Sequence, residues 1–146
     1  MDILNVLEKA TQINSVSGSE NEIRKFISDN VKKYCDELSV DAMGNLIAHK
    51  KGNGKKIMFA AHMDEIGIIV TDIDDKGFVR FSSVGGLNLR NLVNLRVRFA
   101  NSVEGVIGAE EESFKDKPAI SKLYVDLGAA DKKEAEKIVS IGDTAS

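Results

Sequence analysis

The amino-acid sequence predicts an α/β segment followed by a small, partly closed β-barrel or sandwich. Two helical patterns open the chain, and a run of five apolar residues at 57–61 follows two short strand patterns. From residue 67 onward the pattern changes to several short strands separated by turn residues, which is typical of a barrel or sandwich. The sequence therefore divides near residue 66 into two units of different architecture.

The first of these units begins with two predicted helices. Apolar residues recur close to helical spacing over residues 3–13, and Asp2 is placed to cap the first turn. Ser19 and Glu22 have the form of a capping box, which predicts a second helix from that point to about Tyr34.

Strand signals complete the first unit. Short strands are predicted at 37–40 and 45–50. The run 57–61 shows no polar alternation, which predicts a strand covered on both faces, as in the parallel sheets of α/β proteins. Open α/β sheets bind ligands beyond the carboxyl ends of their strands, so the residues that follow 61 occupy a candidate site.

The second unit shows period-two patterns. Strands at 68–73 and 78–81, joined by a turn at 74–77, predict a β-hairpin. Strict alternation over 95–99 predicts a half-buried strand with Arg96 and Arg98 facing solvent or a partner. The same signals predict strands at 103–107 and 123–127, a charged loop at 110–117, a helix from 131 to about 139 and a turn at 141–144 into another strand.

Composition limits the function classes. With 146 residues, 42% of them apolar and 29% charged, the chain is globular and has the length of one ordinary domain or two very small ones. A net charge of −3 with scattered lysines argues against a nucleic-acid partner. The single cysteine, Cys35, excludes an intrachain disulfide or a thiolate zinc cluster. We find no secretory signal and no membrane-spanning run, so we expect a cytoplasmic protein without a membrane partner.

His62 and Asp64 are the candidate site residues. Side chains two residues apart on an extended strand share a face, which suits a metal-bound imidazole whose other ring nitrogen is held by a carboxylate. The alternative is a hydrogen-bonded structural histidine, because one such pair does not fill a coordination sphere. Glu65 should point to the opposite face and bond the backbone or a neighbouring strand. His49, which lies among lysines, is predicted to be a solvated strand residue.

An ordered set of motifs spans nearly the whole chain. They are Ala61-His62-Met63-Asp64-Glu65-Ile66-Gly67, Val84-Gly85-Gly86 with Arg90 shortly after, Gly105-Val106-Ile107-Gly108, Leu123-Tyr124-Val125-Asp126-Leu127-Gly128-Ala129 and Ile141-Gly142-Asp143. In this order they resemble the glutamyl-aminopeptidase or tetrahedral-aminopeptidase family of dinuclear metallopeptidases. Members of that family are often labelled cellulase M or endoglucanase.

The resemblance implies a domain organisation and a site. Residues 1–66 would be the amino-terminal part of an α/β metallopeptidase domain, and residues 67–146 a nearly complete inserted β-barrel domain, PDZ-like and used in dimerisation. His62 would ligate one of two divalent metal ions, zinc or cobalt. Asp64 would have the catalytic role of orienting that imidazole. The family's remaining metal ligands and its general base have no counterpart in the 146 residues.

We therefore expect a metal-dependent aminopeptidase that acts on the amino-terminal residues of peptides and forms homo-oligomers through the β domain. We expect this chain to be the amino-terminal part of such an enzyme, inactive by itself. One alternative is an oligomerisation or assembly module with a vestigial metal site. A third, glycan hydrolysis, follows only from the family's label, and no carboxylate pair has a spacing that indicates it.

Overall fold

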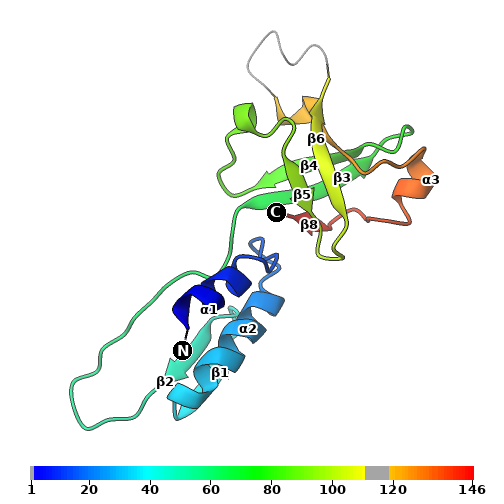
Figure 1. Cartoon of the computed structure of the whole chain (residues 1–146). Helices are drawn as coiled ribbons and strands as arrows, with labels where there is room; N and C mark the ends of the chain where they lie inside the picture. The colour runs from blue at the N-terminus through cyan, green and yellow to red at the C-terminus, as the bar shows by residue number, and fades with distance from the viewer. Residues whose placement is uncertain (1, 111–118) are drawn as a thin grey trace.

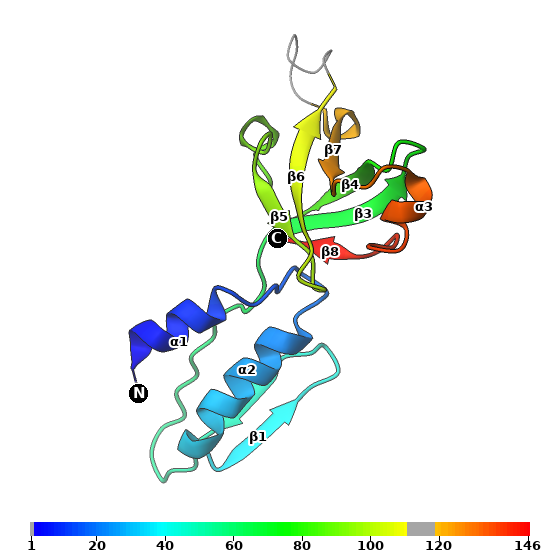
Figure 2. The same ribbon diagram turned by 45° about the vertical axis from the view of Figure 1, so that its right-hand side comes forward.

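The structure is a computed structural model that describes residues 2–110 and 119–146 (Figures 1 and 2). It has a mixed α/β fold with two antiparallel sheets, a two-stranded one of order β1-β2 and a six-stranded one of order β5-β6-β7-β4-β3-β8. The helices α1 (Ile3–Ala10) and α2 (Asn21–Val31) lie with the small sheet at one end of the molecule, while α3 (Lys132–Ala135) lies beside the large sheet (Figure 1). Apart from Glu110, the predicted charged loop lies outside the described residues.

The amino-terminal elements largely follow the prediction. Asp2 caps α1, since its side chain accepts hydrogen bonds from the Leu4 and Asn5 amides, and α2 continues into a 3-10 turn, η1 (Lys32–Tyr34). The strands β1 (Glu37–Val40) and β2 (Leu46–His49) pair in antiparallel register. The predicted capping box is wrong, because Glu20 is the N-cap and the Ser19 hydroxyl accepts a hydrogen bond from Thr144 instead.

The predicted buried strand at 57–61 is also wrong. Residues 50–64 form no helix or strand, and the segment swings outward before it reaches β3 (Figure 1). Ile57, Met58 and Phe59 are 79%, 87% and 94% exposed. A buried strand needs hydrogen-bonding neighbours and a cover on each face, and among the described residues none supplies either. The α1 helix shares this exposure, because none of its residues is buried.

Six strands build the large sheet. They are β3 (Gly67–Ile73), β4 (Val79–Val84), β5 (Arg96–Arg98), β6 (Glu104–Ala109), β7 (Leu123–Asp126) and β8 (Thr144–Ala145). The predicted β3–β4 hairpin is confirmed, and its turn is held by Asp74, whose carboxylate accepts hydrogen bonds from the Lys76 and Phe78 amides. Reciprocal backbone hydrogen bonds between Arg98 and Ser146, of 2.7 and 3.1 Å, join the two ends of the strand order. The sheet therefore curls back on itself.

The core lies inside this curled sheet. Val97 is buried between exposed Arg96 and Arg98, as the alternation predicts. The buried apolar residues of the cluster are Ile68, Val70, Ile73, Val79, Phe81, Leu92, Val97, Phe99, Ile107, Leu123, Val125, Ala135, Val139 and Ala145. Short 3-10 turns, η2 (Leu89–Asn91) and η4 (Ile120–Lys122), connect the strands. The predicted helix at 131–139 is shorter than expected, because α3 ends at Ala135 and tighter hydrogen bonds between residues three apart follow it.

Candidate functional site

His62 and Asp64 lie in the irregular segment that leads into β3. The Nδ1 atom of His62 is 3.0 Å from the Asp64 Oδ1 atom and 3.0 Å from the Asp64 main-chain carbonyl oxygen. The imidazole side chain is 85% exposed and the Asp64 side chain is 37% exposed. The two side chains are thus in contact, but at the end of an exposed segment and not at the end of a buried strand.

The contacts of Nδ1 define the tautomer of the neutral ring. A carbonyl oxygen and an ionised carboxylate are acceptors only, so Nδ1 must carry the proton that both of them receive. The other nitrogen, Nε2, then keeps its lone pair. This is the arrangement of a metal-binding histidine whose second nitrogen is held by a carboxylate.

Ser17 completes the group. Its hydroxyl donates a hydrogen bond to Asp64 Oδ2, the carboxylate oxygen that does not face His62. The hydrogen bonds from Ser17 and then from His62 hold the pKa of the Asp64 carboxyl below its ordinary value. Asp64 is therefore ionised at neutral pH and accepts a hydrogen bond on each oxygen. Sequence patterns missed Ser17, because it lies in the loop between the first two helices and its partner is 47 residues away.

Glu65 points elsewhere and ties the segment to the chain before α2. The Ser15 amide donates to Glu65 Oε1 at 2.9 Å, and the Glu65 amide donates to the Ser15 carbonyl at 2.9 Å. The Ser17 amide donates to the Glu65 carbonyl at 3.3 Å, and Val16, fully buried, forms a parallel bridge with Glu65. The backbone contact expected of Glu65 is confirmed.

One imidazole is not a complete metal centre. Among residues 2–110 and 119–146, no group of three or more His, Cys, Asp or Glu side chains is placed to hold a metal ion. His62 fits as a single donor, by virtue of its free Nε2 and its held Nδ1. His49 is the solvated strand residue that was predicted, with its ring 3.1 Å from Glu37, the residue opposite it across the β1–β2 pair.

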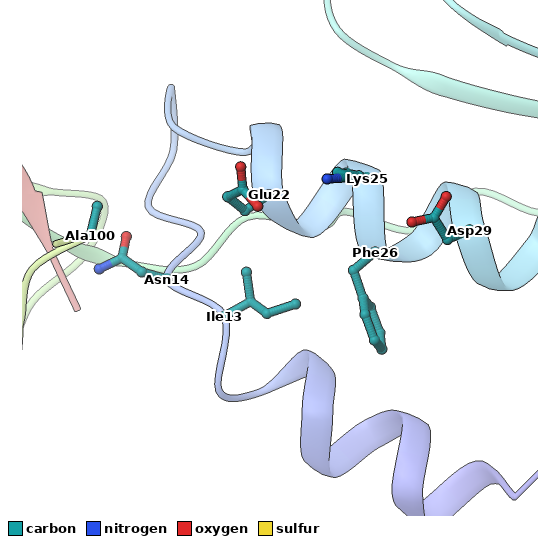
Figure 3. Close-up of a pocket in the computed structure, with 7 residues that line it drawn as sticks. All are labelled: Ile13, Asn14, Glu22, Lys25, Phe26, Asp29 and Ala100. Carbon is teal, nitrogen blue, oxygen red and sulfur yellow. The ribbon is translucent and has the colours of Figure 1, made fainter. Parts of the chain in front are cut away.

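A groove of about 420 Å³ lies between α2 and the chain that follows α1 (Figure 3). Ile13 and Phe26 supply apolar surface to it. Asn14, at one end, donates to the Arg98 carbonyl at 2.8 Å. His62 and Asp64 are not among its lining residues, so the groove and the candidate pair are separate features.

The described helices can be compared with the length and apolar character of a membrane-spanning helix. None of those found in residues 2–110 and 119–146 combines the length and the apolar character that crossing a bilayer requires.

A family model, curated relatives and solved structures identify the family of this chain. Residues 44–146 match the family model described as M42 glutamyl aminopeptidase. A relative from Acetivibrio thermocellus named "Putative aminopeptidase" is 53% identical over 146 residues, which cover 99% of this chain and 44% of the relative. An endoglucanase structure from Thermotoga maritima aligns with a TM-score of 0.86 and 39% identity over 96% of this chain and 43% of its own. The TET1 peptidase of Pyrococcus horikoshii, described as assembling into a tetrahedron or a large octahedral shell, aligns with a TM-score of 0.83 and 37% identity over 97% of this chain and 45% of its own.

These matches place the chain in a family of peptidases, with a mixed α/β fold like that of the amino-terminal part of TET aminopeptidases. The chain belongs to the M42 glutamyl aminopeptidase family. It spans between 43% and 45% of the length of the three proteins named above.

Proposed function

We propose that this chain is the amino-terminal part of a metal-dependent aminopeptidase and that His62 supplies one ligand to its metal centre. The observation that carries the proposal is the His62 ring, which Asp64 holds on Nδ1 at 3.0 Å and whose side chain is 85% exposed. Family membership supports peptide hydrolysis from the amino terminus. The substrate class is therefore peptides with a free amino-terminal residue.

The proposal includes two divalent ions, zinc or cobalt, in the complete centre. Such ions polarise the scissile carbonyl and lower the pKa of bound water. His62 would hold one of them through Nε2, while Asp64 keeps the ring in the required tautomer and orientation. The other ligands and the general base would come from outside the described residues, which hold no group of three suitable side chains.

The proposal also divides the chain between two roles. Residues 1–66 would belong to the catalytic domain, and residues 67–146 would form an inserted β domain that makes subunit contacts. The curled sheet, whose end strands β5 and β8 are joined by backbone hydrogen bonds, and its own apolar core support this division. The shell-like assembly described for the Pyrococcus horikoshii peptidase supports a homo-oligomer. The cytoplasm is the location proposed from the sequence.

A chimera tests the catalytic part of the proposal. The 146 residues are joined to the remaining length of the Acetivibrio thermocellus relative, and hydrolysis of an aminoacyl-anilide is measured with Zn²⁺ or Co²⁺ and with a chelator. We expect chelator-sensitive hydrolysis that His62→Ala abolishes and that Asp64→Ala lowers by about 10–100-fold. His49→Ala is the matched control and should leave the rate unchanged, because that exposed ring is hydrogen-bonded to Glu37 and does not belong to the proposed centre.

Two results would contradict the proposal. One is chelator-sensitive hydrolysis by the 146-residue chain alone, because this chain would then not depend on ligands from elsewhere. The other is a His62→Ala chimera as active as the His49→Ala chimera. The first result would contradict the need for ligands from elsewhere, and the second would remove His62 from the centre.

The second candidate function is an assembly module with a vestigial metal site. The exposure of residues 57–59 favours it, and so does the lack, within the described residues, of a group of three His, Cys, Asp or Glu side chains that could hold a metal ion. A chain that self-associates normally but binds no Zn²⁺ at His62 would support the module. Glycan hydrolysis is favoured by the endoglucanase names of matched structures alone. Release of sugar from a β-glucan by the chimera would be needed to support it.

A further inference from the structure

Asp64 must present one particular oxygen to His62 if it is to hold the ring. The terminal torsion of an aspartate side chain is broad and roughly two-fold, so an exposed carboxylate readily turns its oxygens away from a partner. Asp64 is more than one-third exposed, and its backbone lies outside any helix or sheet ladder. A second contact on the carboxylate is therefore needed to fix Oδ1 at 3.0 Å from Nδ1.

Ser17 makes that second contact. Its hydroxyl donates to Oδ2, so each carboxylate oxygen has a separate partner, Ser17 on one side and His62 on the other. A hydroxyl suits this position, because it donates without neutralising the carboxylate charge that attracts the Nδ1 proton. A lysine in its place would compete with the imidazole for the same charge.

The backbone places the Ser17 hydroxyl rigidly. Ser15 and Ser17 both bond to Glu65, the residue directly after Asp64, and Val16 between them is fully buried. Gly67 permits this close approach, since a Cβ there would lie 2.5 Å from a Val16 methyl group. The loop before α2 and the segment before β3 thus act as one paired unit.

We infer that Ser17 is a positioning residue, which fixes the Asp64 carboxylate so that the His62 ring keeps Nδ1 protonated and Nε2 available. This inference rests on the proposed function for its purpose, but its geometry concerns only Ser17, Asp64 and His62. The contact joins Ser17, which precedes α2, to Asp64, which precedes β3. Ser17 therefore couples the packing of the α2 loop to the orientation of the imidazole.

The tautomer of His62 is measured directly in the 146-residue chain. Long-range ¹H–¹⁵N spectra resolve the two ring nitrogens, and they are recorded at alkaline pH so that the two tautomers of the neutral ring are compared. We expect the wild-type His62 nitrogens to resonate far apart, because one tautomer dominates. In Ser17→Ala the difference between the Nδ1 and Nε2 chemical shifts of His62 should become smaller. In Ser17→Thr, which keeps the hydroxyl, this difference should match the wild-type value. The Asp64 carbonyl also accepts from Nδ1, so a partial narrowing is expected.

Two controls are built into the chain. His49, held by Glu37, should keep its nitrogen shifts in every variant and serves as an internal reference. Ser19→Ala removes a hydroxyl from the same loop that bonds to Thr144 and not to Asp64, so it should leave His62 at wild-type values. If Ser17→Ala shifts backbone amides throughout the chain, that variant does not separate the loss of the hydroxyl from a loss of packing. Ser17→Thr then decides, because it keeps the hydroxyl: wild-type His62 nitrogen shifts in this variant support positioning by the hydroxyl.

Unchanged His62 nitrogen shifts in Ser17→Ala would overturn the inference, and so would equal narrowing in Ser19→Ala. A Zn²⁺ titration followed on the His62 signals separates this inference from the proposed function. We expect Ser17→Ala to weaken Zn²⁺ binding by up to about tenfold, the lower end for partners that orient a metal ligand. If Zn²⁺ leaves wild-type His62 unperturbed, the metal role fails, while the tautomer comparison still decides the role of Ser17.

Discussion

Gly67 is the position at which the segment before β3, the loop before α2 and β8 meet. A Cβ built on Gly67 would lie 2.5 Å from the Ala145 carbonyl oxygen and 2.5 Å from a Val16 methyl group. Cβ atoms are essentially never seen closer than 3.0 Å to such neighbours, so Gly67→Ala requires a shift of about 0.5 Å in a backbone and a buried side chain. Overpacking of this kind typically costs about 1–3 kcal/mol, and we predict that loss in the free energy of unfolding.

Gly86→Ala is the matched control. A Cβ at Gly86 meets no atom within 4 Å, and the residue has no left-handed backbone conformation that would strain alanine. Any effect on the unfolded chain is shared by both variants and favours alanine by about 0.4–1 kcal/mol, so the difference between them isolates the steric cost. Urea unfolding followed by circular dichroism measures both. Equal free energies of unfolding for the two variants would refute the close packing of Val16 against β3.

Three further predictions follow from the large sheet and the exposed segment. Leu123→Ala, at a fully buried position, should lower the free energy of unfolding by about 2–5 kcal/mol in the same urea experiment, and a loss below about 1 kcal/mol would contradict the described core. Hydrogen bonds from Lys122 and Arg80 hold the pKa of the Glu110 carboxyl below its ordinary value, so its stabilisation is present at neutral pH and is lost as the pH falls through that lowered pKa. Glu110→Gln should therefore reduce the urea midpoint more at neutral pH than in acid where the carboxyl is protonated, and the opposite order would count against the ion pairs. Phe59→Ser, at a 94% exposed position, should change the free energy of unfolding by no more than about 0.5 kcal/mol. The same variant should self-associate less than the wild type in sedimentation velocity, because it removes exposed apolar surface. Unchanged self-association would show that the exposed run 57–59 does not drive association.

The β-rich half of the fold could be predicted from the sequence because apolar and polar residues alternate along its strands. Val97 between Arg96 and Arg98 has only one arrangement that buries an apolar side chain and solvates two charges. The hairpin turn was equally local, since Asp74 accepts hydrogen bonds from amides two and four residues later. Local signals of this kind need no knowledge of distant partners.

The prediction of a buried strand at 57–61 was wrong because such a strand depends on distant partners. An apolar run indicates that a segment is stabilised by burial. The side chains that bury it and the strands that pair with it must come from residues elsewhere in the fold. Among the described residues none packs on Phe59, so the run stays irregular and exposed. The same limit applies to the capping box, because Ser19 bonds to Thr144, which is 125 residues away.

The candidate site was predictable only in part. The contact between His62 and Asp64 spans two residues and could be anticipated from their spacing. Ser17 could not be anticipated, because its bond to Asp64 depends on how the loop before α2 pairs with Glu65. A hydroxyl in a loop carries no periodic signal, and its role becomes visible only when the folded chain places it beside a carboxylate.

The central claim is that His62 offers a free Nε2 to a metal ion while Asp64 holds its other nitrogen. The most direct test is a Zn²⁺ titration of the 146-residue chain, with the ring signals of both histidines followed by NMR. We predict that Zn²⁺ shifts the His62 Nε2 signal in the wild type and that Asp64→Ala weakens this response. A titration in which His49 responds and His62 does not would contradict the claim.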